Sequence, residues 1–160
     1  MTDEIRAFHE SGHACAHHHF SHPVSEVAIG GDDGGYCAFA RGAKRYFSDD
    51  ETKALKQREA HLEQAITCCA GKYAVAALNG RRADYGWKRS EDRAQALRYC
   101  LAYCDGDEVA AELLLAYAMR RAELLVEKRW PQIHKLAFGL LEHEKLTGEQ
   151  VKQILNGLTP

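Results

Sequence analysis

Two histidines and a glutamate near the N-terminus have the types and spacing needed for metal chemistry. His9 and His13 are four residues apart in the pattern His-Glu-x-x-His. On an α-helix, residues at this spacing share one face, with Cβ atoms about 5–6 Å apart, so both rings can bind one tetrahedral zinc ion. Glu10 follows the first histidine and is the candidate general base, because zinc lowers the pKa of a water molecule to about 7.

This pattern also occurs by chance, and the alternative is a polar helix face with histidines that bind nothing. Four further histidines follow closely, at positions 17, 18, 19 and 22. The surrounding sequence favours a helix nonetheless. Thr2 and Asp3 are good N-cap residues, and apolar residues then recur at helical spacing. We therefore expect the pattern to lie on one amphipathic helix.

Length and composition limit the class of protein. The chain has 160 residues, of which 46% are hydrophobic, which predicts one domain over residues 1–160. A formal charge of -2 gives no basic surface for nucleic acid or an anionic membrane, so neither is expected as a partner. No apolar run approaches about 20 residues and no leader pattern is present. We expect a cytoplasmic protein, and its six cysteines to be reduced thiols.

The rest of the pattern predicts a mainly α (α+β) fold with a small β-hairpin near the N-terminus. Residues 23–30 and 35–40 are two short β-type runs, with a turn signal at residues 32–34. Signals for five further helices follow. A capping box at 48–51 begins a helix that ends near Gly80, and Ser90 caps a helix that runs to Cys104. A helix over 107–128 comes next, Pro131 begins another that ends at about Lys145, and the capping box Thr147-x-x-Gln150 begins the last.

A catalytic zinc site needs a third protein ligand. The candidates are Asp84, Glu91 and Asp92 and the histidines at 17, 61, 134 and 143. His17 is too far from His9, about 12 Å along a straight helix axis. The residues alone leave Asp84, Glu91 and Asp92 open, since an acid at position 92 also suits the first turn of a helix without any metal.

Five segments resemble, in the right order, the proteolytic domain of the FtsH-type ATP-dependent zinc metallopeptidases. The residues that carry the resemblance are 7–14 (the family's A-x-HEAGH-A helix), 23–29 (its PV-x-KVTI strand), 71–80 (GGRAAEEL-x-FG), 90–97 (SND-L-x-x-AT) and the tail from 124 to 150. The resemblance covers nearly the whole chain and implies a helical, zincin-like peptidase domain. It implies a Zn2+ cofactor bound by His9, His13 and Asp92, with Glu10 as the catalytic base.

Two features differ from that family. The glycine-rich approach to the aspartate is replaced by residues 85–92, which include Trp87, Lys88 and Arg89. The P-loop pattern Gly-x-x-x-x-Gly-Lys-Ser/Thr is absent from these residues. We therefore expect a stand-alone peptidase domain that works without ATP. The family's hexameric rings imply a homo-oligomer, with six subunits by resemblance.

The leading functional hypothesis is a zinc-dependent endopeptidase that acts on unfolded or partner-delivered polypeptides. An extended peptide could bind by strand addition along residues 36–40. One alternative is a regulatory or interaction protein that keeps the fold with little turnover, which the change at Trp87, Lys88 and Arg89 motivates. Another is a small His-Glu-x-x-His protease specific for one repressor. Cleavage of an unfolded protein such as casein separates the first hypothesis from the second.

Overall fold

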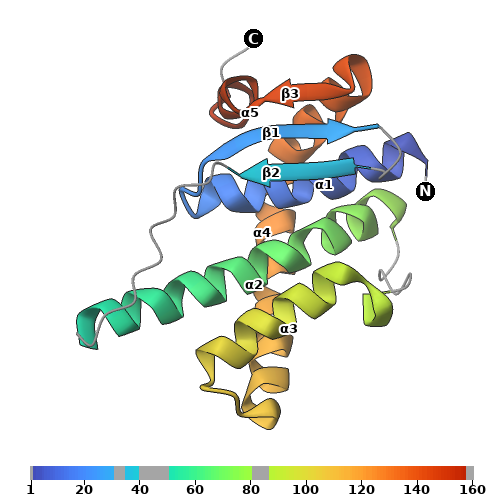
Figure 1. Ribbon diagram of the computed structural model, residues 1–160. Helices are drawn as coiled ribbons and strands as arrows, with labels where there is room; N and C mark the ends of the chain where they lie inside the picture. Colours follow the sequence, from blue (N-terminus) through green and yellow to red (C-terminus); the bar gives the residue numbers. More distant parts are fainter. Residues whose placement is uncertain (1, 31–34, 40–50, 81–86, 158–160) are drawn as a thin grey trace.

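Five α-helices and a three-stranded antiparallel sheet make up the part of the chain that the structure describes (Figure 1). This computed structural model describes residues 2–30, 35–39, 51–80 and 87–157. The elements are α1 (Asp3–His19), β1 (Val24–Ile29), β2 (Gly35–Phe39), α2 (Glu51–Asn79), a short 3-10 turn η1 (Trp87–Arg89), α3 (Glu91–Tyr103), α4 (Glu108–His143), β3 (Lys145–Thr147) and α5 (Gly148–Leu155). The fold is mainly α, as the sequence predicts.

The sheet has the strand order β2-β1-β3, so β1 is central and β2 is an edge strand. Val27 of β1 lies opposite Cys37 of β2 on one side and Leu146 of β3 on the other. The predicted hairpin is therefore confirmed, although its turn at 32–34 and residue 40 lie outside the described residues. β3 was not expected, because three residues are too few to show an alternating pattern.

Side-chain caps begin the helices where the sequence predicts them. Thr2 accepts a hydrogen bond from the backbone N–H of Ile5 at the start of α1. Thr147 and Gln150 form the predicted capping box of α5. Gly80 follows the end of α2 with a φ of +59°, a left-handed conformation that glycine adopts without strain. Residues 48–50 of the capping box predicted at 48–51 lie outside the described residues, and α2 begins at Glu51.

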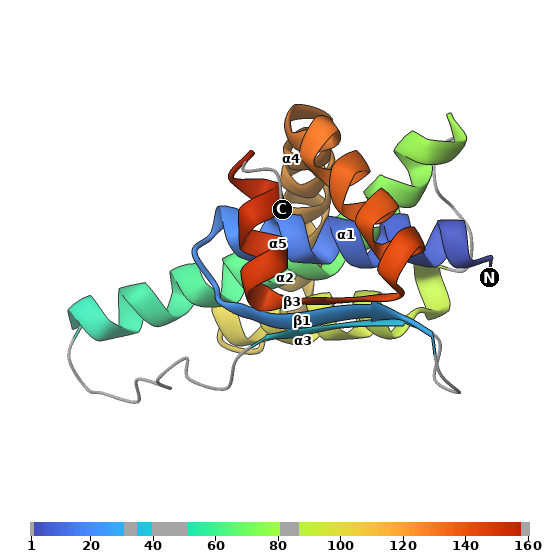
Figure 2. The same ribbon diagram turned by 90° about the horizontal axis from the view of Figure 1, so that it is seen from above.

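The prediction of two helices around Pro131 was wrong, because α4 runs unbroken from Glu108 to His143. A proline inside a helix removes one backbone hydrogen bond and costs about 3 kcal/mol. Packing on both sides of Pro131 offsets this cost. Trp130 stacks on Phe8 of α1 with ring centroids 5.4 Å apart, and Ile133 and Leu136 are fully buried. Helix α4 changes direction along its length in Figure 2, and a proline inside a helix is a common cause of such a bend.

Helix α1 is the centre of the packing. One core cluster joins its Phe8, Ala14 and Cys15 to the sheet, the second half of α4 and α5. A second cluster fills the space between α2, α3 and the first half of α4, and includes Trp87 and Cys100. In the described part of the chain, no helix combines the length and the apolar character needed to cross a membrane.

α1 and α2 approach each other closely at Gly12. A Cβ atom placed on Gly12 would lie 2.7 Å from the backbone oxygen of Ala70 and 2.9 Å from the Cβ of Ala74. Both distances are shorter than van der Waals contact, and a backbone oxygen within a helix cannot turn aside. Only glycine at position 12 allows the two helices to pack this closely. The close packing in turn sets the distance between the side chains of α1 and the backbone of α2.

We predict that Gly12→Ala destabilises the protein by about 1–3 kcal/mol, the usual cost of overpacking, even though alanine favours a helix. Urea unfolding followed by circular dichroism measures the change. Gly139→Ala is the matched control, since its Cβ would lie 3.4 Å from Leu146 Cδ1, an ordinary contact. That variant should gain up to about 1 kcal/mol from helix propensity. Equal stability of Gly12→Ala and the wild type would contradict the close approach.

Candidate metal centre

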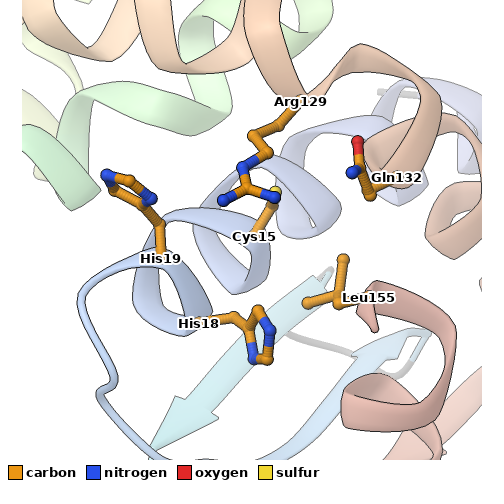
Figure 3. Close-up of a pocket in the computed structure, with 6 residues that line it drawn as sticks. All are labelled: Cys15, His18, His19, Arg129, Gln132 and Leu155. Carbon is orange, nitrogen blue, oxygen red and sulfur yellow. The ribbon is translucent and has the colours of Figure 1, made fainter. Parts of the chain in front are cut away.

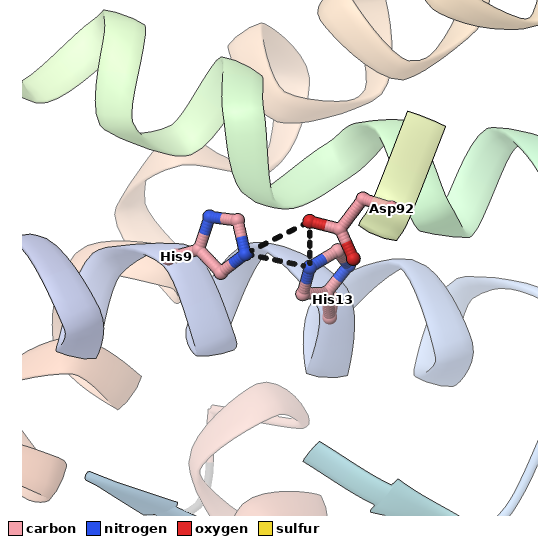
Figure 4. Close-up of side chains that lie close together, drawn as sticks. All are labelled: His9, His13 and Asp92. Atoms are coloured by element: carbon pink, nitrogen blue, oxygen red, sulfur yellow. Dashed lines mark hydrogen bonds and ion pairs between the residues drawn. The ribbon is translucent and has the colours of Figure 1, made fainter. Parts of the chain in front are cut away.

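Three side chains that could bind a metal converge where α1 meets the start of α3 (Figure 4). The Nε2 atoms of His9 and His13 are 3.1 Å apart. Asp92 Oδ2 lies 3.1 Å from Nε2 of His9 and 3.5 Å from Nε2 of His13. Among the described residues, this is the one group of three or more potential ligands close enough to hold a metal ion. The structure thus brings together the three residues implied as ligands.

The triangle formed by these three atoms has the size that zinc requires. Zinc bonds of about 2.0–2.1 Å in a tetrahedron place neighbouring ligand atoms about 3.3–3.4 Å apart. The observed separations of 3.1, 3.1 and 3.5 Å bracket that value. Two imidazole nitrogens and one carboxylate oxygen are also a donor set that suits zinc. The residues therefore fit the metal.

Asp92 owes its position to a capped helix start. Ser90 accepts a hydrogen bond from the backbone N–H of Arg93, which fixes the first turn of α3. The hydroxyl and the backbone N–H of Ser90 both donate to the backbone oxygen of Trp87. The Trp87 side chain is 7% exposed and packs in the second core cluster. Trp87 is therefore an anchor for the helix that carries Asp92.

Helix α2 packs against the rings of His9 and His13 and fixes their positions. Nδ1 of His13 lies 2.8 Å from the backbone oxygen of Thr67. A carbonyl oxygen only accepts, so Nδ1 carries the hydrogen and Nε2 faces Asp92 and His9. A Cβ atom on Gly71 would lie 2.5 Å from Nε2 of His13 and 2.7 Å from Cε1 of His9. Glycine at position 71 leaves the space that both rings occupy, a role that sequence reasoning missed.

Glu10 is buried beside the histidines and under the edge strand. It is 8% exposed, and a Cβ atom on Gly35 of β2 would lie 3.3 Å from its Oε1. Burial raises the pKa of the Glu10 carboxyl above its ordinary value, with His13 and His9 opposing this and Asp92 adding to it. A carboxyl with a raised pKa is suited to accept and return protons near neutral pH.

His13 and Asp92 form a charged pair when no metal is bound. Burial disfavours the charged imidazolium, but the hydrogen bond and charge of Asp92, with Glu10 and Thr67, outweigh it and raise the pKa of His13 to about 9. Burial likewise opposes ionisation of Asp92, yet the hydrogen bonds and charges of His13 and His9 hold its pKa well below the ordinary value. The carboxylate thus stays ionised and available as a ligand.

The other ligand candidates lie elsewhere. The side chain of Glu91 is 82% exposed and pairs with Arg98, and Asp84 is outside the described residues. His17 is buried beside His22, and burial together with His13 and His22 lowers its pKa to about 3. The three remaining histidines also lie away from the centre. His61 is near Tyr99, and His134 lies between Phe8 and Phe138. His143 is exposed beside Glu142.

A small hollow lies at the other end of α1, between α4 and α5 (Figure 3). Its lining residues are Cys15, His18, His19, Arg129, Gln132 and Leu155. It shares no residue with the His9, His13 and Asp92 group. We assign no part of the metal centre to it.

Comparison with known proteins relates the chain to zinc proteases. It is 27% identical to the ATP-dependent zinc metalloprotease FtsH of Caldicellulosiruptor bescii over 95% of this chain and 30% of the relative. It is 28% identical to the ATP-dependent zinc metalloprotease FTSH 11, chloroplastic/mitochondrial, of Arabidopsis thaliana over 96% of this chain and 21% of that protein. A shorter match to FtsH 1 of Thermoanaerobacter sp. is 37% identical over 32% of this chain and 9% of the relative.

The chain is a distant relative of the FtsH zinc metalloproteases. It spans less than a third of the length of each of these three relatives. No model of a protein family matches it. The resemblance noted in the sequence is therefore supported at the level of distant homology.

We predict that Asp92→Ala reduces zinc binding from one ion per chain to well below one, because two histidines alone leave the ion without its third protein ligand. Metal content of the purified protein, measured by mass spectrometry, tests this. Glu91→Ala is the matched control, since it removes a neighbouring acid that faces solvent. Full zinc content in Asp92→Ala, or its loss in Glu91→Ala, would contradict the assignment.

We predict that zinc affinity rises as pH increases from about 7 to 9, by up to tenfold per pH unit, because zinc binds only neutral imidazole and must displace the proton of His13. Titration calorimetry at pH 7.5 in buffers of different ionisation enthalpy should show release of about one proton. In the metal-free protein, protonated His13 stabilises the folded state. This contribution is fully present below the pKa of about 6.5 that His13 has in the unfolded chain, and it is lost as the pH rises through about 9. An affinity independent of pH over this range would contradict the pairing.

Proposed function

We propose that this chain is a zinc-dependent endopeptidase that hydrolyses peptide bonds in unfolded polypeptides. One observation carries the proposal: His9, His13 and Asp92 converge within 4.8 Å of one another, beside the buried carboxyl of Glu10 and next to a sheet edge. The distant homology to ATP-dependent zinc metalloproteases supports the same reaction.

His9 and His13 would hold zinc through Nε2, and Asp92 through a carboxylate oxygen. When bound, zinc supplies Lewis-acid polarisation of the scissile carbonyl and increases the acidity of water. The carboxylate of Glu10 would accept the proton of the attacking water and then deliver it to the nitrogen of the leaving amine. Its raised pKa suits both steps, because a more basic carboxylate is a better acceptor near neutral pH.

The edge strand β2 offers a place for the substrate backbone. Among the described strands β2 pairs with β1 alone, so its other edge has backbone N–H and C=O groups available for an extended peptide. Gly35, at the start of β2, lies against Glu10. A peptide added along β2 would therefore pass beside the catalytic base. This mode of binding requires an extended segment, which an unfolded chain provides and a folded domain does not.

The role of ATP and of partners is part of the proposal. Hydrolysis of a peptide bond at this site would use no ATP, because neither the zinc ligands nor Glu10 needs a nucleotide. The relatives are named ATP-dependent, whereas this chain would act on polypeptides that are already unfolded or that a partner delivers. Assembly of this chain into a homo-oligomer, a hexamer by resemblance, stays a prediction.

We predict that Glu10→Gln keeps the fold and one zinc per chain but cleaves unfolded casein about 100- to 10,000-fold more slowly, since an amide cannot accept a proton from water. Gel-based cleavage assays and metal analysis of the same preparations measure both quantities. Glu91→Gln, an exposed glutamate in the same region, should cleave like the wild type. Unchanged cleavage in Glu10→Gln would remove Glu10 from the mechanism.

The same assays address the alternatives. A wild-type protein that binds zinc but cleaves no unfolded polypeptide would favour a regulatory or interaction protein with this fold. Cleavage of a single folded partner, with casein left intact, would favour a repressor-specific protease.

A further inference from the structure

Two exposed cations, Lys88 and Arg89, lie immediately before the helix that carries Asp92. Lys88 and Arg89 form the exposed part of the turn η1, between buried Trp87 and the capping residue Ser90. Arg89 precedes Asp92 by three residues, so their Cα atoms are at most about 11 Å apart. Both cations are therefore exposed within a short distance of the centre that Asp92 helps to form.

This turn is held in place rather than loosely attached. The side chain of Trp87 is buried in the core between α2 and α3, and the backbone oxygen of Trp87 accepts two hydrogen bonds from Ser90. The ammonium of Lys72 lies over the Trp87 ring at 5.0 Å and over the Tyr73 ring at 5.2 Å. Because Lys72 directly follows Gly71, this contact ties the turn to the part of α2 that lies against both histidine rings.

The described acids around Lys88 and Arg89 pair with other residues. On α3, Glu91 pairs with Arg98, and Glu112 of α4 pairs with Arg93. Among the described residues, Lys88 and Arg89 form no ion pair. The whole chain has a formal charge of -2, so the positive charge here is a local feature and not the average of the surface.

We propose that Lys88 and Arg89 form a cationic rim that makes the site prefer acidic segments of unfolded polypeptide. This inference rests on the proposed peptidase function and names its substrate class. Acidic side chains flanking the scissile bond would lie within a Debye length of the rim, where attraction is still felt at physiological salt. The rim would repel basic segments. The resulting difference in affinity between acidic and basic substrates would make the site selective.

The test uses three quenched fluorescent peptides with the same residues around the scissile bond. Their flanking residues are Asp and Glu, Asn and Gln, or Lys and Arg. We expect wild-type kcat/KM for the acidic peptide to exceed that for the basic peptide by about fivefold or more at low salt, mainly through KM, as two exposed charge pairs allow. The ratio should fall toward one in 0.5 M salt.

The double variant Lys88→Glu, Arg89→Glu should lower this ratio to one or below. The matched control is Lys135→Glu, Lys152→Glu, which changes net charge equally at two exposed positions on α4 and α5, outside the metal centre. The control should keep the wild-type ratio. A wild-type ratio near one, or an unchanged ratio in the Lys88 and Arg89 variant, overturns the rim while leaving the peptidase function intact.

A binding measurement distinguishes an error in the proposed cationic rim from an error in the proposed peptidase function. The affinity of zinc-loaded Glu10→Gln protein for the three peptides is measured by fluorescence anisotropy, whatever the cleavage result. If the wild type cleaves no peptide, the proposed function fails. Tighter binding of the acidic peptide, lost in Lys88→Glu, Arg89→Glu on the same background, supports the rim. Equal affinities, or no binding of any peptide, overturn it.

Discussion

The close contact between α1 and α2 is the constraint on which the site depends. At Gly12 the absence of a side chain lets α1 lie against the backbone of Ala70, and at Gly71 the same absence makes room for both histidine rings. The contact also brings the backbone oxygen of Thr67 within 2.8 Å of His13, which fixes the orientation of that ring. If the helices were farther apart, the rings would have neither this partner nor this position. The two glycines therefore serve the chemistry through packing alone.

Much of the local structure could be predicted because its causes are local. Thr2, Ser90 and Thr147 each accept a hydrogen bond from a backbone N–H three residues later, and each begins a helix as expected. The spacing of His9 and His13 places them on one helix face whatever surrounds them. Asp92 is different, because 79 residues separate it from His13. Helical spacing cannot reach so far, and the residues alone left three acids open until the family resemblance singled out one.

The errors have a common physical origin in tertiary packing. Pro131 is a sound signal for a helix start, yet on either side of it Trp130 stacks on Phe8 and Ile133 is fully buried, and this packing keeps α4 continuous. Leu146 forms a strand of three residues because β1 offers it a partner, and its side chain is 1% exposed. Thr67 and Gly71 contribute a backbone oxygen and an empty space. Neither is a property that a side-chain pattern reveals.

The two carboxylates of the centre show how environment assigns different roles to the same chemical group. Asp92 and Glu10 both lie beside His9 and His13, and burial disfavours the charge of both. Asp92 receives hydrogen bonds from the histidines, which hold its pKa low. For Glu10 the attraction of the histidines does not overcome burial, and its pKa is raised. Groups whose environments separate their pKa values in this way are the ones expected to divide the work of ligand and base. The division follows from position, since Asp92 stands at the capped start of α3 facing the rings, whereas Glu10 points from α1 toward β2.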